Sequence, residues 1–299
     1  MTGKPRTLVM SGGTRGIGRS ALRELLSRDP QLHVILLTRT TASAESRRVT
    51  PVRADMERPA SVRAAAATVR EMLTDGDVPP LCGLALNAGI SVLSATQATP
   101  DGLERTFAVN VLGPHLLIAG LAPLIEPPGR IVVTVSDAHF GDFRHTFGTM
   151  PPPRWADPAV LARPGAFPRP DSVSAGRAAY TTSKLAAIYL VHEWARRLPA
   201  GAGIVAHNPG LVPGTGLARE AGPLARFLMG TASRPMTLTP FADTVTAAGR
   251  RLAGVILGRP AAPSGSYIDR TSVARSSPES YDETRERDLV TQLDRIGGC

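Results

Sequence analysis

Tyr180 and Lys184 are the residues whose types and spacing most directly suggest chemistry in this chain of 299 residues. They stand four residues apart at the start of an apolar run with helical spacing, so we expect them to share one helix face. An ammonium group beside a phenol favours the phenolate and lowers the tyrosine pKa from its ordinary value of about 10. A solvated surface helix would explain the same pair. However, only Lys4 and Lys184 among the 34 basic residues are lysines, which favours a specific role for Lys184.

Two further polar residues stand where apolar segments end or are interrupted. Ser136 directly follows the apolar residues 131–135, which we predict to be a buried strand. Asn110 lies inside a long apolar helical stretch that runs from about residue 106 to residue 125. A buried asparagine must find a partner for its amide or cost stability. Asn110 and Ser136 therefore join Tyr180 and Lys184 as the polar residues whose surroundings the fold must explain.

The chain begins with a segment that is typical of a nucleotide-phosphate loop. A short apolar strand is predicted over 6–10, and it is followed by glycines spaced G-x-x-x-G-x-G and then by a helical pattern that stops at Asp29. Glycines let backbone amides approach a diphosphate, and the helix N-terminus supplies partial positive charge. A purely structural glycine turn is the alternative. The candidate cofactor residues of this loop are Gly12, Thr14, Arg15, Gly16, Ile17 and Gly18.

The second predicted strand, 33–38, indicates which nicotinamide cofactor would bind. An acidic residue at its end would bind the ribose hydroxyl of NAD, but this strand is followed by Arg39. Arg15 and Arg39 together favour the 2′-phosphate of NADPH, although a chain with 32 arginines places some by chance. After a third strand at 49–53, Asp55 contacts the adenine or caps the helix predicted over 61–73. Met56, beside it, is a further candidate for cofactor contact.

The remaining strand ends complete the predicted cofactor site. Asn87, Ala88 and Gly89 follow a fourth strand at 81–86, and their small size would let the backbone pass close to a ribose. A sixth strand at 203–207 precedes a turn-rich stretch in which Pro209, Gly210, Val212 and Thr215 would lie near the nicotinamide. Helices are also expected over 240–257 and 279–296, and an edge strand over 266–268. The predicted fold is one α/β domain, 1–299, with a doubly wound Rossmann-type parallel sheet of about seven strands and helices on both faces.

Residues 137–179 form a long insertion before the Tyr180 helix. Seven prolines between positions 150 and 170 forbid a regular strand or a long helix there. Long loops in compact domains are usually functional or disordered. The apolar and aromatic content of this one, including Trp155 and Phe167, favours a substrate-facing lid over a free linker.

Composition narrows the partners that we expect. The formal net charge is +9, but the arginines are scattered and aromatic residues make up only 4%, so nucleic acid is not the expected partner. Cys82 and Cys299 give neither a disulfide framework nor a metal site, which fits a reducing cytoplasm. No signal-peptide pattern is present, and we expect no apolar run to reach the length of about 20 residues that a membrane span needs. We expect a cytoplasmic monomer or homodimer with neither a bound metal nor a membrane partner.

These motifs together resemble the short-chain dehydrogenase/reductase family over essentially the whole chain. The matching elements, in the family's order, are residues 11–18, Asn87-Ala88-Gly89, Asn110, Ser136, the segment Tyr180–Lys184 and Asn208-Pro209-Gly210. Ser11 in place of the usual threonine, and Asp137 after Ser136, are small departures. The local sequences of residues 107–117 and 209–219 are similar to those of the branch that contains retinol dehydrogenases and protochlorophyllide reductase. The long insertion is a further similarity to that branch. The insertion lacks the functional cysteine of that photoenzyme, so a light-driven reaction is not expected. The arginine-rich, lysine-poor composition is similar to that of GC-rich bacteria, in which such enzymes often tailor natural products.

The resemblance implies an NADPH-dependent reduction of a ketone or aldehyde on a bulky, largely hydrophobic small molecule. Tyr180 would donate the proton, Lys184 would lower its pKa and bind the nicotinamide ribose, and Ser136 would hydrogen-bond the carbonyl oxygen. Asn110 would hold a water that links Lys184 to solvent. Reduction of a conjugated C=C bond is an alternative within enzymes, and a regulatory protein that binds NADPH without turnover is the alternative from another class. A sugar epimerase or dehydratase is less favoured, because its glycine loop has a different spacing.

Overall fold

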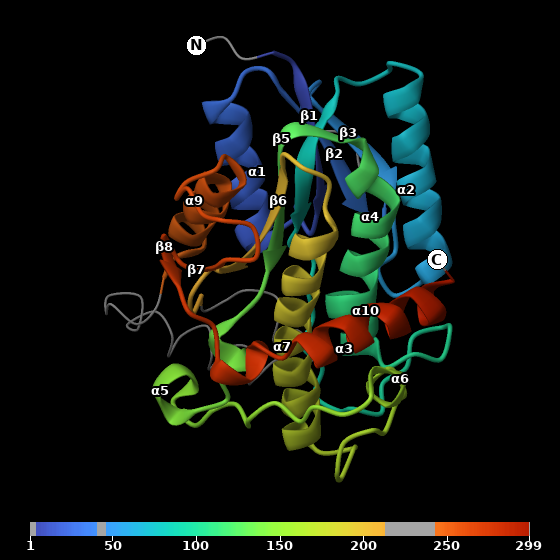
Figure 1. Cartoon of the computed structure of the whole chain (residues 1–299), viewed down its shortest axis with the longest axis vertical. Helices are drawn as coiled ribbons and strands as arrows, with labels where there is room; N and C mark the ends of the chain where they lie inside the picture. The colour runs from blue at the N-terminus through green and yellow to red at the C-terminus, as the bar shows by residue number, and fades with distance from the viewer. Residues whose placement is uncertain (1–3, 41–45, 213–242, 299) are drawn as a thin grey trace.

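The computed structural model describes residues 4–40, 46–212 and 243–298, and their centre is an eight-stranded sheet (Figure 1). From one edge to the other the strands are β3 (Val49–Arg53), β2 (Leu32–Thr38), β1 (Arg6–Ser11), β4 (Leu81–Leu86), β5 (Ile125–Thr134), β6 (Ala202–Asn208), β7 (Tyr267–Asp269) and β8 (Ser272–Ala274). The first seven run parallel, and β8 pairs antiparallel with β7. The predicted fold class is confirmed, and β8 raises the expected number of about seven strands to eight.

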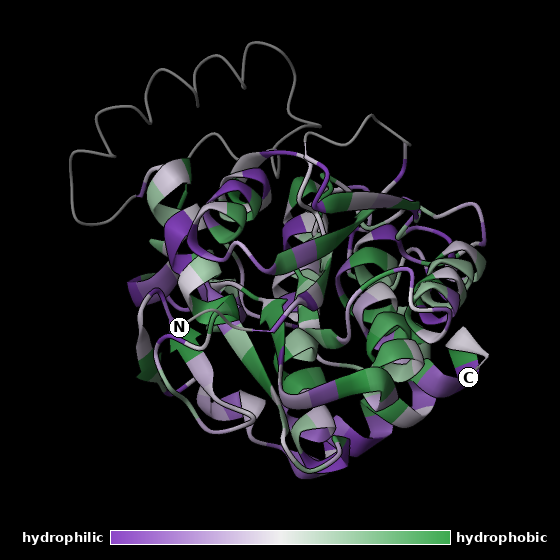
Figure 2. Ribbon diagram, turned by 90° about the horizontal axis from the view of Figure 1, so that it is seen from above, coloured by the Kyte–Doolittle hydropathy of each residue, from purple (hydrophilic) through white to green (hydrophobic). Residues whose placement is uncertain are grey.

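Helices cover both faces of the sheet and bury its apolar strands. One face packs against α1 (Gly16–Arg28) and α9 (Val245–Ile256), and the other packs against α2 (Pro59–Thr74), α7 (Val173–Arg197) and α10 (Glu283–Gly297). Valine, isoleucine and leucine in the inner strands are buried on both sides, as parallel sheets require. Figure 2 shows this pattern as hydrophobic strands between helices whose polar residues lie outward.

The apolar stretch around Asn110 is a continuous but irregular helix. It comprises α3 (Arg105–Phe107), a π-helical turn (Ala108–Leu112), α4 (Gly113–Leu121) and a 3-10 turn (Ala122–Leu124). Arg105–Leu124 is long and apolar enough to cross a membrane, so the expectation that no such run exists was wrong. Its apolar window is 78% buried inside the protein, because it lies in the core between the sheet and α2. Burial in the core therefore accounts for its composition.

The insertion packs along the protein instead of forming long regular elements. It contains a 3-10 turn (Asp137–His139), α5 (Phe143–Thr146) and α6 (Pro158–Leu161). The backbone N–H of Arg154 donates to Thr182 Oγ1 at 2.9 Å, and the Trp155 ring packs edge-on against Tyr189. The proline-based prediction of short elements is thus confirmed, while the role as a substrate lid stays a prediction.

Helix α7 begins earlier than the sequence indicated. It starts at Val173, seven residues before Tyr180, because Ser172 caps it by accepting from the N–H of Ala175 at 3.2 Å. The insertion therefore ends at residue 172 in structural terms. The first turns of α7 consist of small residues. At Gly176 the reason is space, because a Cβ there would collide with the backbone of residues 92–94. The close contact holds the loop after β4 against the helix that carries Tyr180.

Candidate active site

The carboxyl ends of β1, β4, β5 and β6 meet at one edge of the sheet, where most of the predicted site residues lie. Asn87 ties three of these ends together. Its Nδ2 donates to the Gly12 carbonyl at 3.1 Å, and its Oδ1 accepts from Thr134 Oγ1 at 3.2 Å. The N–H of Ala88 donates to Ser11 Oγ at 3.2 Å. This edge is where parallel α/β sheets bind their ligands.

Tyr180, Lys184 and Ser136 come together at the end of β5. The Tyr180 hydroxyl lies near the Ser136 side chain, whose hydrogen-bonding influence lowers the pKa of Tyr180. Lys184 Nζ lies 5.6 Å from the centre of the Tyr180 ring and donates to the Thr134 carbonyl at 3.0 Å. Both Tyr180 and Lys184 are buried, with 7% and 4% of their surface exposed. The helical spacing of four residues thus places a phenol and an ammonium together as predicted.

Burial dominates the acid–base properties of this pair. It raises the pKa of Tyr180 to about 12, and the hydrogen bond with Ser136 lowers that pKa by less. Burial also lowers the pKa of Lys184 to about 8. The expected lowering of the Tyr180 pKa by Lys184 was wrong for the protein alone, because Nζ lies over the ring and both groups are removed from water.

Asn110 finds its partners within the protein. In the π-helical turn its Oδ1 accepts from the N–H of Ile90 at 2.9 Å, and its Nδ2 donates to the Ile90 carbonyl at 2.9 Å. Nδ2 also lies 3.0 Å from Ser183 Oγ. The amide is therefore satisfied within the protein by the loop after β4 and by α7, and the water that Asn110 would hold stays a prediction. π-helical turns of this kind are frequent at functional sites.

Gly89 lies between the asparagine and the lysine. A Cβ on Gly89 would lie 3.4 Å from Asn110 Oδ1 and 3.6 Å from Lys184 Nζ. The predicted site residues of the fourth strand end, the Asn110 helix and α7 therefore adjoin one another. A side chain at Gly89 would therefore lie directly against the lysine.

The glycine loop has the geometry of a phosphate cradle. Gly12 has φ +69°, and a Cβ on it would lie 2.7 Å from the Ala88 nitrogen. Gly18 faces the Gly12 carbonyl and Asn87, so α1 starts directly against the strand ends. Gly16 has φ +54° with open space beside it, and Arg15 does not cap the first turn of α1 with its side chain. Uncapped N–H groups at an open helix N-terminus fit a diphosphate.

The other predicted cofactor residues flank this cradle or follow the adjoining strands. Thr14, Arg15 and Arg39 are exposed, and Ile17 is half-buried. Asp55 does not cap α2, which begins at Pro59 after Arg58; its Oδ1 accepts from the N–H of Glu57 at 3.1 Å. Half-buried Met56 packs toward Gly113.

The stretch after β6 is described only in part. Pro209 and Val212 are buried, and Gly210 has φ +83° while its N–H donates to Asn208 Oδ1 at 3.2 Å. Thr215 lies outside the described residues. The turn is held at its start by Asn208, whose Nδ2 donates to Asp269 Oδ1 on β7 at 2.9 Å.

Thr134 and Ser183 are site residues that the sequence analysis missed. Thr134 accepts from Lys184 through its carbonyl and donates to Asn87 through its hydroxyl. Ser183 contacts Asn110 and donates to the Tyr180 carbonyl at 2.7 Å. A backbone carbonyl carries no signal in a sequence. Ser183 stands inside the Tyr180–Lys184 segment, and its position on the helix face toward Asn110 was the available clue.

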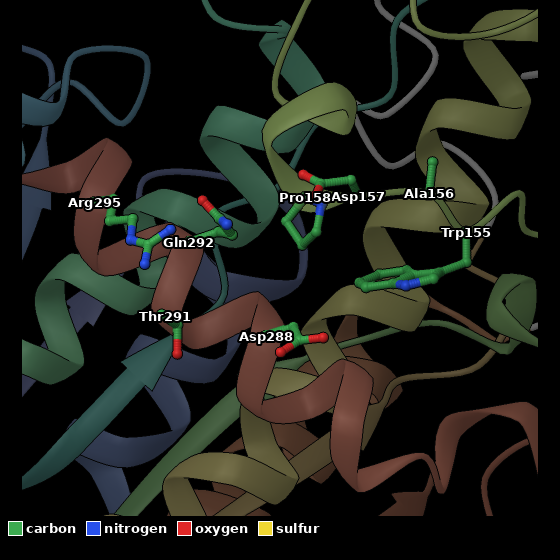
Figure 3. A pocket seen from close by; sticks show the side chains of 8 residues that line it. All are labelled: Trp155, Ala156, Asp157, Pro158, Asp288, Thr291, Gln292 and Arg295. Atoms are coloured by element: carbon green, nitrogen blue, oxygen red, sulfur yellow. The ribbon is translucent and has the colours of Figure 1, made fainter.

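A separate cleft of about 530 Å³ lies between α10 and the insertion segment 155–158 (Figure 3). It is lined by Trp155, Ala156, Asp157, Pro158, Asp288, Thr291, Gln292 and Arg295. Its lining contains none of the predicted catalytic or cofactor residues. The predicted site residues therefore lie at the edge of the sheet and not at this cleft.

Comparisons with known proteins agree with this geometry. A family model described as short chain dehydrogenase matches residues 6–146. Protochlorophyllide reductase B, chloroplastic, of Oryza sativa subsp. japonica is 28% identical over 288 residues, which are 87% of this chain and 68% of that protein.

Solved structures share the fold. A protein of unknown character from Mycobacterium paratuberculosis has a TM-score of 0.65 at 22% identity, over 99% of this chain and 94% of that one. The NADPH-bound carbonyl reductase from chicken fatty liver has a TM-score of 0.59 at 19% identity, over 91% and 99%. The glycine cradle, the strand-end residues and the family match over residues 6–146 agree, and the chain resembles short-chain dehydrogenases/reductases, including protochlorophyllide reductase.

Proposed function

We propose that this protein reduces a ketone or aldehyde on a bulky, largely hydrophobic small molecule with NADPH. The observation that carries the proposal is the Lys184 ammonium, which lies over the Tyr180 ring and is held by the Thr134 carbonyl at the end of β5, with Ser136 beside the tyrosine. A phenol, a hydroxyl and an ammonium in this arrangement suit protonation of an oxygen that gains negative charge.

The chain's own residues account for the proton side of the reaction, and bound NADPH would supply the hydride. Burial keeps Tyr180 protonated at neutral pH, with a pKa of about 12, so it is a donor and not a base before the reaction. Ser136 would hydrogen-bond the carbonyl oxygen and stabilise its developing charge. Lys184, with a pKa of about 8, carries its charge at pH 7 and would favour the phenolate that remains once the proton has left.

The cofactor would lie along the strand ends. The cradle of Gly12, Gly16 and Gly18 would hold the diphosphate, with Thr14 and Ile17 beside it. Arg15 and Arg39 are both exposed next to this cradle and would bind the 2′-phosphate, and Asp55 with Met56 would border the adenine. The ribose near Lys184 would lie against the backbone of Asn87, Ala88 and Gly89. The nicotinamide would be bordered by Pro209, Gly210, Val212 and Thr215.

Exposed apolar side chains support a hydrophobic substrate. Leu93, Phe143, Phe147 and Leu211 are 38%, 75%, 50% and 47% exposed. They come from the segments that follow β4, β5 and β6, which are the segments around the predicted site. Large apolar groups exposed from three neighbouring loops favour an apolar ligand. Small polar carbonyl compounds are therefore expected to be poor substrates.

The test is turnover by Tyr180→Phe and Ser136→Ala variants across a panel of aromatic ketones, aldehydes and enones. We expect Tyr180→Phe to lose about 10²- to 10⁴-fold in kcat while it still binds NADPH, because only the proton donor is removed. Tyr281→Phe, at a tyrosine that is 48% exposed and outside the site, is the matched control and should keep its turnover.

Two outcomes would contradict the proposal. Near wild-type turnover by Tyr180→Phe would remove Tyr180 as the acid. NADPH binding without consumption across the whole panel would favour the non-catalytic regulatory protein. Product analysis with deuterium-labelled NADPH separates carbonyl reduction from the reduction of a conjugated C=C bond, since the label then lies on the carbinol carbon or on a former alkene carbon.

A further inference from the structure

His139 is a buried histidine, 1% exposed, that stands three residues after Ser136. Its Nε2 accepts a hydrogen bond from the backbone N–H of Ser277 at 3.0 Å, and its Nδ1 lies 2.7 Å from the Ser136 carbonyl oxygen. A backbone N–H can only donate, so Nε2 must be unprotonated and the ring proton must be on Nδ1. His139 therefore donates from Nδ1 to Ser136. The lowering of its pKa to about 4 by burial agrees with a neutral ring at pH 7.

The Ser136 carbonyl is fixed by two hydrogen bonds from the same residue. Besides Nδ1, the backbone N–H of His139 donates to this oxygen at 3.2 Å. On its other side, Ser136 Oγ accepts from the N–H of Ala138 at 3.2 Å. Since the orientation of a peptide carbonyl fixes the neighbouring backbone, the His139 ring holds the backbone from which the Ser136 side chain projects.

The ring of His139 is itself held from several directions. It packs against Phe140, with ring centres 4.1 Å apart, and edge-on against Tyr267 at 5.3 Å. The Tyr267 hydroxyl donates to Asp137 Oδ1 at 2.6 Å, which fixes the same turn from β7. The turn that carries Ser136 is thus clamped between β7 and the segment around Ser277.

The partner of Nε2 is also rigidly placed. Ser280 Oγ donates to the Ser277 carbonyl at 2.7 Å and lies 2.6 Å from Ser276 Oγ. Tyr189 of α7 donates to the Glu279 carbonyl at 2.8 Å, so this segment is tied to the helix that carries Tyr180. The segment 276–280 therefore gives His139 a fixed anchor beside the site.

We propose that His139, held as the Nδ1–H tautomer between Ser277 and Ser136, is a positioning residue that orients the Ser136 hydroxyl toward the reacting oxygen. It acts through Ser136 and does not touch the substrate. The proposal rests on the proposed function, because orienting Ser136 matters only if its hydroxyl hydrogen-bonds the reacting oxygen. A histidine that only fills the core would affect folding but not the turnover of folded enzyme.

The kinetic test compares His139→Phe and His139→Asn with the control His145→Phe. Phenylalanine keeps an aromatic ring but loses both hydrogen bonds, whereas asparagine keeps a donor near the Nδ1 position. We expect His139→Phe to lose about 10- to 100-fold in kcat, with the Kd for NADPH within twofold of wild type, because the hydroxyl is misplaced and the cofactor cradle is not. His139→Asn should recover part of the loss. His145 stacks on Phe140 in the same insertion without contacting Ser136, so His145→Phe should stay within twofold in kcat.

A second measurement does not depend on activity. In wild-type protein, ¹⁵N NMR of the histidine side chains should show a protonated Nδ1 and an unprotonated Nε2 for His139 at pH 7, assigned by the signals lost in His139→Asn. Failure of the proposed function would appear as turnover that survives Tyr180→Phe, which leaves the tautomer result intact. Unchanged kcat in His139→Phe, an equal loss of NADPH binding, or a protonated Nε2 would each overturn the positioning role. If His139→Phe does not fold, the asparagine variant and the NMR signals decide.

Discussion

Three ionisable side chains show how strongly burial acts in this protein at the scale of single residues. Burial raises the pKa values of Tyr180 and Glu104 and lowers that of Lys184. Each shift favours the uncharged form, as removal from water requires. Glu104 has no predicted role in the reaction. Its side chain caps the helix that carries Asn110 by accepting from the N–H of Phe107 at 2.6 Å.

The first prediction at this scale concerns the pH dependence of folding stability at Glu104. Burial raises the pKa of Glu104 to about 7. Between its ordinary pKa of about 4.5 and about 7, the folded state therefore holds a proton that the unfolded state has lost. The stability that this group contributes is complete below pH 4.5 and is lost as the pH rises through 7, by about 3 kcal/mol in total.

Glu104→Gln should remove this loss, because glutamine stays uncharged and still accepts from Phe107. Urea unfolding between pH 5 and pH 8 should show the variant gaining stability relative to wild type as the pH rises. Glu126→Gln, at an exposed carboxyl, controls for the lost charge. A difference between Glu104→Gln and wild type that does not change with pH would show that Glu104 ionises freely in the folded protein.

Residue types and spacing were enough to place the reacting groups together but not to set their chemistry. The spacing of Tyr180 and Lys184 predicted one helix face, and the two side chains do lie together. The direction of the Tyr180 pKa was missed because burial depends on segments far away in the chain. The partners of Asn110 were missed for the same reason, since Ile90 and Ser183 approach it only in the folded protein.

At the scale of elements, the sequence predicted most inner strands to within a residue or two, but β5 begins at Ile125, six residues before the predicted start at residue 131. Buried strands of valine, isoleucine and leucine have a strong composition signal, and β2 and β6 extend only one residue beyond the predicted bounds at their starts. The exposed three-residue strand β8 has no such signal and was missed. The start of α7 was missed because its first turns are built from small residues, which are needed for the close contact at Gly176 and show no apolar period.

The junction between α1 and the strand ends gives the second prediction, at Gly18. A Cβ at Gly18 would lie 2.6 Å from Asn87 Nδ2 and would also meet the Gly12 carbonyl, so Gly18→Ala must move α1 or break the Asn87 bridge. We expect a stability loss of about 1–3 kcal/mol from overpacking and at least tenfold weaker NADPH binding. Denaturant unfolding and fluorescence titration with NADPH would measure the two effects.

Gly254→Ala is the matched control, because Gly254 is also a buried helical glycine. A Cβ there has only the Arg259 carbonyl within 4 Å, at 3.7 Å, which is ordinary van der Waals contact. This variant should gain up to about 1 kcal/mol from the higher helix propensity of alanine and should bind NADPH normally. If Gly18→Ala had the same stability and the same NADPH affinity as Gly254→Ala, the close contact of α1 with the strand ends would not be needed for cofactor binding.

At the scale of the whole molecule, the parallel sheet brings together site residues that are distant in the sequence. Gly12, Asn87 and Ser136 follow three different strands and Asn208 ends a fourth, yet they meet at one edge because parallel strands point the same way. A cofactor that spans this edge would contact segments from both halves of the sheet. Its binding should therefore stabilise the entire fold and not only the loop that it touches.

This coupling makes thermal unfolding a test of the cofactor preference. A ligand at 100 times its Kd stabilises the folded state by about 2.7 kcal/mol, or roughly 4 °C for a chain of this size. We expect NADPH to raise the Tm by about this amount and NADH, at equal concentration, by much less, because Arg15 and Arg39 have no 2′-phosphate to bind in NADH. Arg39→Asp should reverse the order, since a carboxylate repels the phosphate and accepts from the ribose hydroxyl. Arg47→Asp, an exposed change at the amino edge of the sheet, should leave the order unchanged. Equal shifts with both cofactors in wild type would exclude the arginines as the source of selectivity, whatever the substrate proves to be.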